Sequence, residues 1–144
     1  SLLPEKVVIE QVTLVHGSAR STVWEYILDR STARANFPFF DTPLCFTGHS
    51  HLATVYQLVN GSPEPHWTVP QENELITLTG RAILNPGSVG QPRDHDPRAC
   101  FAFYYPDESM WELRRVEYDI SAVQERIQQE QLPKRHAQRL SQGW

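Results

Sequence analysis

Short apolar runs separated by Gly, Pro and Asn fill the middle of this 144-residue chain. Runs of this length, rich in β-branched and aromatic residues, predict strands rather than helices. Residues 43–47 are apolar at nearly every position, which predicts a strand buried on both faces. The predicted strands are 7–15 (one strand or a tight pair), 43–47, 53–59, 66–69, 75–79, 81–84, and a hairpin of 100–105 with 110–118.

Helical spacing is confined to the flanks of this region. Trp24, Ile27 and Leu28 predict a helix over 21–30, and a second should cover 32–37 and end before Pro38. Two terminal helices are expected within 119–144. Ser121 with Gln124 should form a capping box for the first of them, and Pro133 lies near the first turn of the second. The expected fold class is α/β (α+β), with residues 1–144 forming one domain or a fragment of one.

Composition narrows the classes of function. The chain is 40% hydrophobic, enough for a core, and its net charge of -4 comes with no basic stripe, so strong nucleic-acid binding is not expected. No apolar stretch is long enough to predict a membrane span. Cys45 and Cys100 lie in apolar runs, which predicts buried thiols and a reducing, cytoplasmic location. The first residues do not resemble a signal peptide, and the missing initiator Met suggests that residues precede Ser1.

Three of the six histidines follow predicted strands. His16 ends the run VTLV, whereas His49 and His51 follow LCFTG. Ligands in layered sheets bind beyond the carboxyl ends of strands, so these imidazoles are candidate metal ligands. The His-x-His pair can grip one ion or divide between two. The alternative is a polar turn in which each ring bonds only to backbone and water. His66, His95 and His136 are weaker candidates.

The segment LNPGSVGQPRD follows another predicted strand and is expected to be loop from Asn85 onward. Its backbone can turn several N–H groups toward an anion, and Arg93 can contact a phosphate oxygen. The alternative is a structural turn in which Arg93 pairs with Asp94, Asp96 or another carboxylate.

Taken together, LVHGS, WEYILD, LCFTGHSH and LNPGSVGQPRD resemble segments that recur in this order in bacterial calcineurin-like metallophosphoesterases. The resemblance covers roughly residues 7–118, and GHSH is a close variant of the family's GHTH. It implies half of a four-layer α/β/β/α sandwich, the C-terminal half. It also implies two divalent metal ions (Mn, Fe, Zn, Ni or Co) in the complete protein, with His16 and His49 on the second metal and His51 on the first. Asn85, Ser88 and Arg93 would then shape the pocket for a small phosphorylated substrate.

The chain departs from the family in what it lacks. The family's D-x-H, G-D and G-N-H segments, which supply the carboxylate ligands and the catalytic His, do not occur in this sequence. A bridging carboxylate offsets the repulsion between two close cations, so three histidines alone make an incomplete site. We therefore expect no catalytic residue in this chain.

Two functions follow as expectations. The parent protein would hydrolyse phosphomonoesters or phosphodiesters, with this chain supplying part of the site and an N-terminal half of the same fold supplying the rest. The alternative is a non-catalytic structural or interaction module that retains the C-terminal part of the fold. The oligomeric state is left open.

Overall fold

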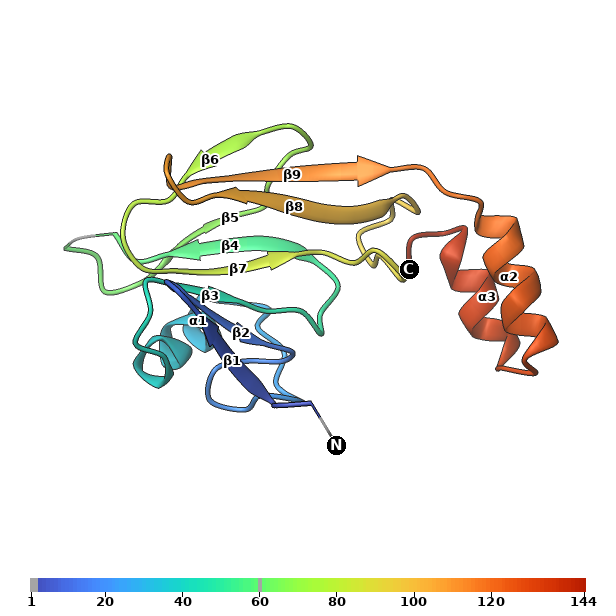
Figure 1. Ribbon diagram of the computed structural model, residues 1–144, viewed down its shortest axis with the longest axis horizontal. Coiled ribbons are helices and arrows are strands. Elements are labelled where there is room, and N and C mark those ends of the chain that lie inside the picture. Colours follow the sequence, from blue (N-terminus) through green and yellow to red (C-terminus); the bar gives the residue numbers. More distant parts are fainter. Residues whose placement is uncertain (1–2, 60) are drawn as a thin grey trace.

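Two β-sheets stacked face to face form the body of the protein (Figure 1). The structure is a computed structural model, and it describes residues 3–59 and 61–144. The larger sheet has the strand order β1-β2-β3-β7-β4-β5, and the smaller sheet has the order β6-β9-β8. The strands are β1 (Lys6–Ile9), β2 (Val12–Val15), β3 (Leu44–Phe46), β4 (Ala53–Gln57), β5 (His66–Thr68), β6 (Leu75–Thr77), β7 (Ala82–Pro86), β8 (Ala99–Tyr105) and β9 (Met110–Val116).

The larger sheet is mixed, and its parallel part matters most for function. β2, β3 and β7 are parallel neighbours, with Leu14 paired to Phe46 and Phe46 to Leu84. β1, β4 and β5 are antiparallel additions at the two sides. The carboxyl ends of the three parallel strands therefore meet at one edge of the sheet.

Alternation along the strands sends apolar side chains to both faces of the larger sheet, as the run 43–47 predicted. Leu44 packs between the two sheets, whereas its neighbour Cys45 packs on the opposite face. The layer between the sheets contains Val12, Leu44, Val55, Ile76, Leu78, Ala82, Leu84 and Trp111. The opposite layer contains Val15, Ala19, Ile27, Ala33, Phe37, Phe40, Cys45, Tyr56 and Ile83.

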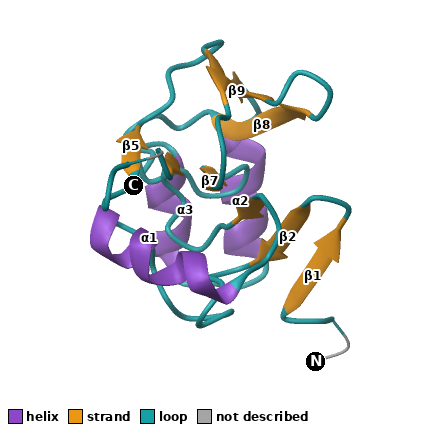
Figure 2. Cartoon of the chain, turned by 90° about the vertical axis from the view of Figure 1, so that its left-hand side faces the viewer, coloured by secondary structure: helices purple, strands orange, loops and turns teal. Residues whose placement is uncertain are grey.

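One short helix covers that opposite face (Figure 2). α1 (Arg30–Asn36) is capped by Asp29, whose carboxylate accepts a hydrogen bond from the Thr32 backbone N–H, and a 3₁₀ turn, η1 (Phe37–Phe39), follows it. The expected helix over 32–37 is thus present, although the helical turns continue through Pro38. Pro38 is tolerated because it lies at the start of η1.

The helix expected over 21–30 is wrong: residues 21–28 form turns and irregular backbone. Local hydrogen bonds compete successfully with helix formation there. The Gly17 N–H donates to the Thr22 carbonyl at 2.7 Å, and the Ser18 hydroxyl bonds to Ser21 and to the Glu25 carboxylate. Of the three apolar residues that suggested a helix, only Ile27 is buried.

The predicted loop at Asn85 also begins later than expected. β7 runs through Pro86, because Thr54 and Ala53 of β4 pair with Asn85 and Pro86. The remaining strands lie within two residues or so of their predicted limits, and the 100–118 hairpin is confirmed.

The terminal helices α2 (Ile120–Gln129) and α3 (Lys134–Leu140) pack on each other beyond the end of the sandwich, past the tips of β7 and β9 (Figure 1). The expected capping box is wrong. Asp119 caps α2 by accepting from the Ala122 N–H, and Gln124 instead donates to the Ala137 carbonyl of α3. Among the described residues, no helix is both long and apolar enough to cross a membrane.

Asp119→Ala should destabilise α2 by about 1 kcal/mol, because it removes an N-cap acceptor. Amide hydrogen exchange in the first turns of α2 should accelerate about fivefold, the factor that corresponds to this energy. Ser121→Ala is the matched control and should leave exchange unchanged. Faster exchange in Ser121→Ala, with unchanged exchange in Asp119→Ala, would show that Ser121 caps α2 instead.

Candidate metal centre

Three loops meet at the edge where the parallel strands end. His16 follows β2, Gly48 and His49 follow β3, and Asn85 lies near the end of β7. Backbone hydrogen bonds tie the loops together, since the Gly48 N–H donates to the His16 carbonyl at 2.9 Å. His16 and His49 therefore follow the carboxyl ends of neighbouring parallel strands, as the sequence predicted.

His16 and His49 are in direct contact. The Nε2 atom of His16 lies 3.0 Å from Nδ1 of His49, and the ring centroids are 4.9 Å apart. The other nitrogen of His49, Nε2, is buried, and a hydrogen bond with the Trp24 backbone also acts on this ring.

His51 is held by a different contact. Its Nδ1 atom lies 2.7 Å from the backbone carbonyl of Gln91, so Nδ1 carries the proton and donates it. Histidines that bind metals usually donate their other ring N–H to a carbonyl or carboxylate in this way. The arrangement leaves the lone pair of His51 on Nε2 rather than on Nδ1.

Backbone geometry also marks this loop. His49 and His51 have φ values of 60° and 61°, in the left-handed region that residues with a Cβ seldom adopt. Unfavourable backbone conformations cluster at functional sites, where the surrounding structure holds them in place.

The protonation of these rings suits metal binding. Burial lowers the pKa of His49, and repulsion from His16 lowers it further. Burial also lowers the pKa of His51, with Arg93 contributing through its positive charge. Both rings are therefore neutral at pH 7, the form that binds a cation.

The histidine pair fits two neighbouring positions on one ion. Ligand nitrogens about 2.0–2.1 Å from a tetrahedral Zn are spaced about 3.3 Å apart, close to the 3.0 Å between His16 and His49. Within residues 3–59 and 61–144, however, no group of three or more His, Cys, Asp or Glu side chains is placed to hold a metal. The pair fits part of a metal site, and the ligand roles of His16, His49 and His51 stay predictions.

Asn85 and Ser88 hold loops together through the atoms that were expected to face a substrate. The Asn85 amide donates to the Gly48 carbonyl at 2.7 Å and to the Ser50 hydroxyl at 3.0 Å, and its oxygen accepts from the Gly87 N–H. The Ser88 hydroxyl accepts from the Gln91 N–H. These contacts fix the loops after β3 and β7. Substrate contact by Asn85 or Ser88 stays a prediction.

Arg93 differs from both, because it has no ion-pair partner among the described residues. The carboxylates that were its alternative partners bind other residues: Asp94 pairs with Arg115, and Asp96 pairs with Arg98 at 2.6 Å. The Nε atom of Arg93 is buried without a hydrogen bond. The structural-turn alternative therefore does not account for Arg93.

Two aromatic residues beside His49 escaped the sequence interpretation. The ring of Tyr26 lies 4.0 Å from that of His49, and Trp24 lies 6.4 Å from it. Both belong to the 21–28 segment that was expected to be helical. The segment is fixed by Glu25, which accepts hydrogen bonds from Ser18 at 2.6 Å and Asn36 at 2.8 Å, and from Arg20.

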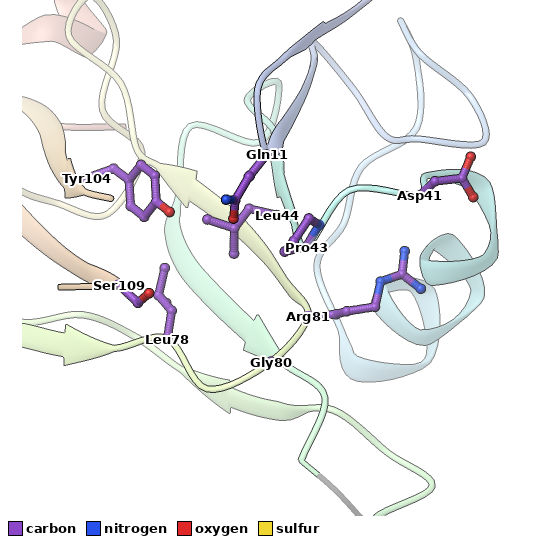
Figure 3. Close-up of a pocket in the computed structure, with 9 residues that line it drawn as sticks. All are labelled: Gln11, Asp41, Pro43, Leu44, Leu78, Gly80, Arg81, Tyr104 and Ser109. Atoms are coloured by element: carbon purple, nitrogen blue, oxygen red, sulfur yellow. The ribbon is translucent and has the colours of Figure 1, made fainter. Parts of the chain in front are cut away.

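A cavity of about 440 Å³ lies away from the histidines, at the amino ends of the same parallel strands (Figure 3). Gln11, Pro43 and Arg81, which line it, each precede one of those strands. The Arg81 guanidinium donates to the carbonyls of Phe37 and Phe40, so its role is structural. This cavity is separate from the histidine centre.

Comparison with known proteins identifies the fold. No family model matches the chain. It is 41% identical to a metallophosphoesterase from Sphaerobacter thermophilus, with a TM-score of 0.88 over 99% of this chain and 59% of that one. It is 29% identical to the uncharacterized protein MJ0912 of Methanocaldococcus jannaschii, over 99% of this chain and 56% of the relative. The hypothetical protein PH1004 of Pyrococcus horikoshii OT3 shares the fold, with a TM-score of 0.69, 20% identity and 52% of its length covered.

The chain thus has a metallophosphoesterase-type fold, and the resemblance found in the sequence is confirmed. It spans just over half the length of the relatives it matches. Its mixed α/β character, with two sheets and few helices, is confirmed as well. The match to about half of a metallophosphoesterase is consistent with the C-terminal half of a calcineurin-like fold.

The Glu25 network should make stability depend on pH. Hydrogen bonds from Arg20, followed by those from Ser18 and Asn36, lower the pKa of Glu25 from 4.5 to about 2. The unfolded chain takes up a proton near 4.5, whereas the folded one does so only near 2. The stability that the carboxylate contributes is therefore fully present above that upper value and is lost as the pH falls toward the lower one.

Glu25→Gln should lower the free energy of unfolding at pH 7 by about 1 kcal/mol or more, because hydrogen bonds to a charged group contribute about 1.5–3 kcal/mol. The variant should also lose less stability than the wild type between about pH 5 and pH 3. Urea denaturation at several pH values measures both effects. Glu108→Gln, in the exposed turn of the hairpin, is the control, and equal pH profiles for Glu25→Gln and wild type would contradict the network's role.

Proposed function

We propose that this chain supplies three histidine ligands, His16, His49 and His51, to the two-metal site of a phosphoesterase. The observation that carries the proposal is the contact of His16 with His49 at the carboxyl ends of parallel strands. The likeness to a metallophosphoesterase supports the same reading. The substrate would be a small phosphomonoester or phosphodiester.

The residues have separate tasks in this proposal. Divalent ions, when bound, stabilise the charge on the reacting phosphate and generate a nucleophile from water at neutral pH. His16 and His49 would hold one ion through Nε2 and Nδ1, and His51 would offer Nε2, kept available by the Gln91 carbonyl. Asn85 positions the loop that carries His49, and Arg93 would bind a phosphate oxygen.

The missing carboxylates must come from elsewhere. The chain covers 59% of the Sphaerobacter thermophilus protein, which leaves room in a parent protein for an N-terminal half of the same fold. We propose that this half brings the bridging carboxylate and the catalytic His. A reducing, cytoplasmic setting is supported by Cys45 and Cys100, which are buried and unpaired as thiols.

The second candidate function is non-catalytic: a structural or interaction module that retains the C-terminal part of the fold. Metal binding separates the two functions, because a module retained only for its shape has no reason to keep a histidine pair in a binding geometry.

His49→Ala should weaken binding of Zn by at least about tenfold. Substitution of a residue that only hydrogen-bonds to a metal ligand already lowers metal affinity by about tenfold or more. Isothermal titration of the purified chain at neutral pH measures this affinity. His66→Ala, an exposed histidine on β5, is the control and should bind Zn like the wild type. Unchanged affinity in His49→Ala would remove the histidine pair from the proposed metal site.

The chain alone should hydrolyse bis-p-nitrophenyl phosphate no faster than buffer with Mn, whereas mixing it with a separately produced N-terminal half should restore turnover. The reason is that one half offers the ions no bridging carboxylate. His16→Ala in the mixture should abolish the restored activity. Metal-dependent turnover by the chain alone, retained on repurification and lost in His16→Ala, would mean that the chain holds a complete site.

A further inference from the structure

A second cavity, of about 250 Å³, adjoins the histidine centre. Tyr26, which lines it, contacts the ring of His49, and Ser50 lies between His49 and His51 in the chain. Residues that are far apart in the sequence build this cavity together. Its lining residues are Tyr26, Leu28, Ser50, Leu52, Arg93, Arg139 and Trp144.

The end of the chain is fixed beside this cavity by several contacts. The His95 N–H donates to the Gly143 carbonyl at 2.8 Å, and the His95 ring stacks on Trp144 with centroids 4.9 Å apart. A Cβ atom at Gly143 would lie 2.6 Å from the Asp96 backbone, so only glycine permits this approach. The position of Trp144 therefore follows from packing and hydrogen bonding.

The charge in the cavity is positive. Arg93 and Arg139 both line it, and no Asp or Glu does. The Nε atom of Arg139 donates to the Trp144 carbonyl at 2.6 Å, which orients the guanidinium and leaves its terminal nitrogens to other partners. Two guanidinium groups with no Asp or Glu side chain among the lining residues suit an anion such as phosphate.

The remaining lining is aromatic and aliphatic. Trp144 is 56% exposed and Tyr26 is 44% exposed, so both rings keep an open surface next to the arginines. Aromatic faces of this kind stack on planar rings, including nucleobases. Cationic and aromatic groups thus lie side by side within reach of the candidate metal centre.

We propose that this cavity binds the aromatic part of a phosphoester substrate, with its phosphate held by Arg93 and Arg139 and its planar ring stacked on Trp144. The proposal deepens the proposed function and rests on it for the identity of the ligand as a substrate. It gives the C-terminal segment a role in specificity: phosphoesters with a planar aromatic group bind more tightly than those without one.

Binding can be measured without catalysis, which separates this proposal from the proposed function. The probes are adenosine monophosphate and ribose 5-phosphate, titrated into the full chain without added metal and followed by NMR chemical shifts. Adenosine monophosphate should bind about tenfold more tightly, because stacking of one base contributes a factor of this order. Equal affinities, or no binding of adenosine monophosphate at millimolar concentration, would overturn the proposal.

The variants assign the contacts. Trp144→Ala should weaken adenosine monophosphate about tenfold and leave ribose 5-phosphate within about twofold, whereas Trp144→Tyr should restore most of the loss. Arg139→Gln should weaken both probes by about fivefold, because both carry the phosphate. Arg135→Gln, an exposed arginine of α3 outside the cavity, is the matched control and should change neither.

The pattern is what tests the site. Equal losses for both probes in Trp144→Ala would show that the tryptophan does not stack on the base, and the proposal would fail. Hydrolysis by the mixed halves is scored separately. Its absence alongside selective binding of adenosine monophosphate would sink the proposed function while leaving the aromatic binding site in place.

Discussion

The parallel alignment of β2, β3 and β7 is the constraint on which the candidate centre depends. Parallel strands end at one edge, so the loops after them meet whether or not their residues are close in the sequence. The register places His16 and His49 within 3.0 Å and brings the Asn85 amide onto the Gly48 carbonyl. A sheet with either neighbour antiparallel would send these loops to opposite edges. The apolar packing on both faces, above all by Leu44 and Cys45 of β3, holds the alignment in place.

Sequence patterns predicted the strands well because most strands carry a short apolar run, and the runs of β2, β3, β4 and β7 are largely buried. They failed where a single polar side chain decides the outcome. Glu25 draws Ser18, Arg20 and Asn36 together across a segment whose apolar spacing looks helical, and nothing local reveals that Asn36 will be the partner. Asp119 likewise takes the cap of α2, while Gln124 is used in a contact with α3 that depends on tertiary packing.

The same division applies to the candidate site. His16, His49 and His51 could be selected because each follows a strand, which is a local signal. The aromatic groups around them could not, since Tyr26 reaches His49 from a misassigned segment and Trp144 arrives from the far end of the chain. Arg93 was ambiguous in sequence because Asp94 and Asp96 are its neighbours. Folding resolves the ambiguity by pairing those carboxylates with Arg115 and Arg98.

The left-handed backbone at His49 and His51 completes the physical argument. Each such residue costs roughly 1–2 kcal/mol compared with ordinary backbone. The hydrogen bonds from Asn85 to Gly48 and Ser50, and between His51 and Gln91, offset this cost by holding the loop from both sides. The histidines are therefore oriented before any ligand arrives. A loop with ordinary φ values at these two residues would have to adopt the left-handed backbone on binding, and the cost of that change would weaken the binding.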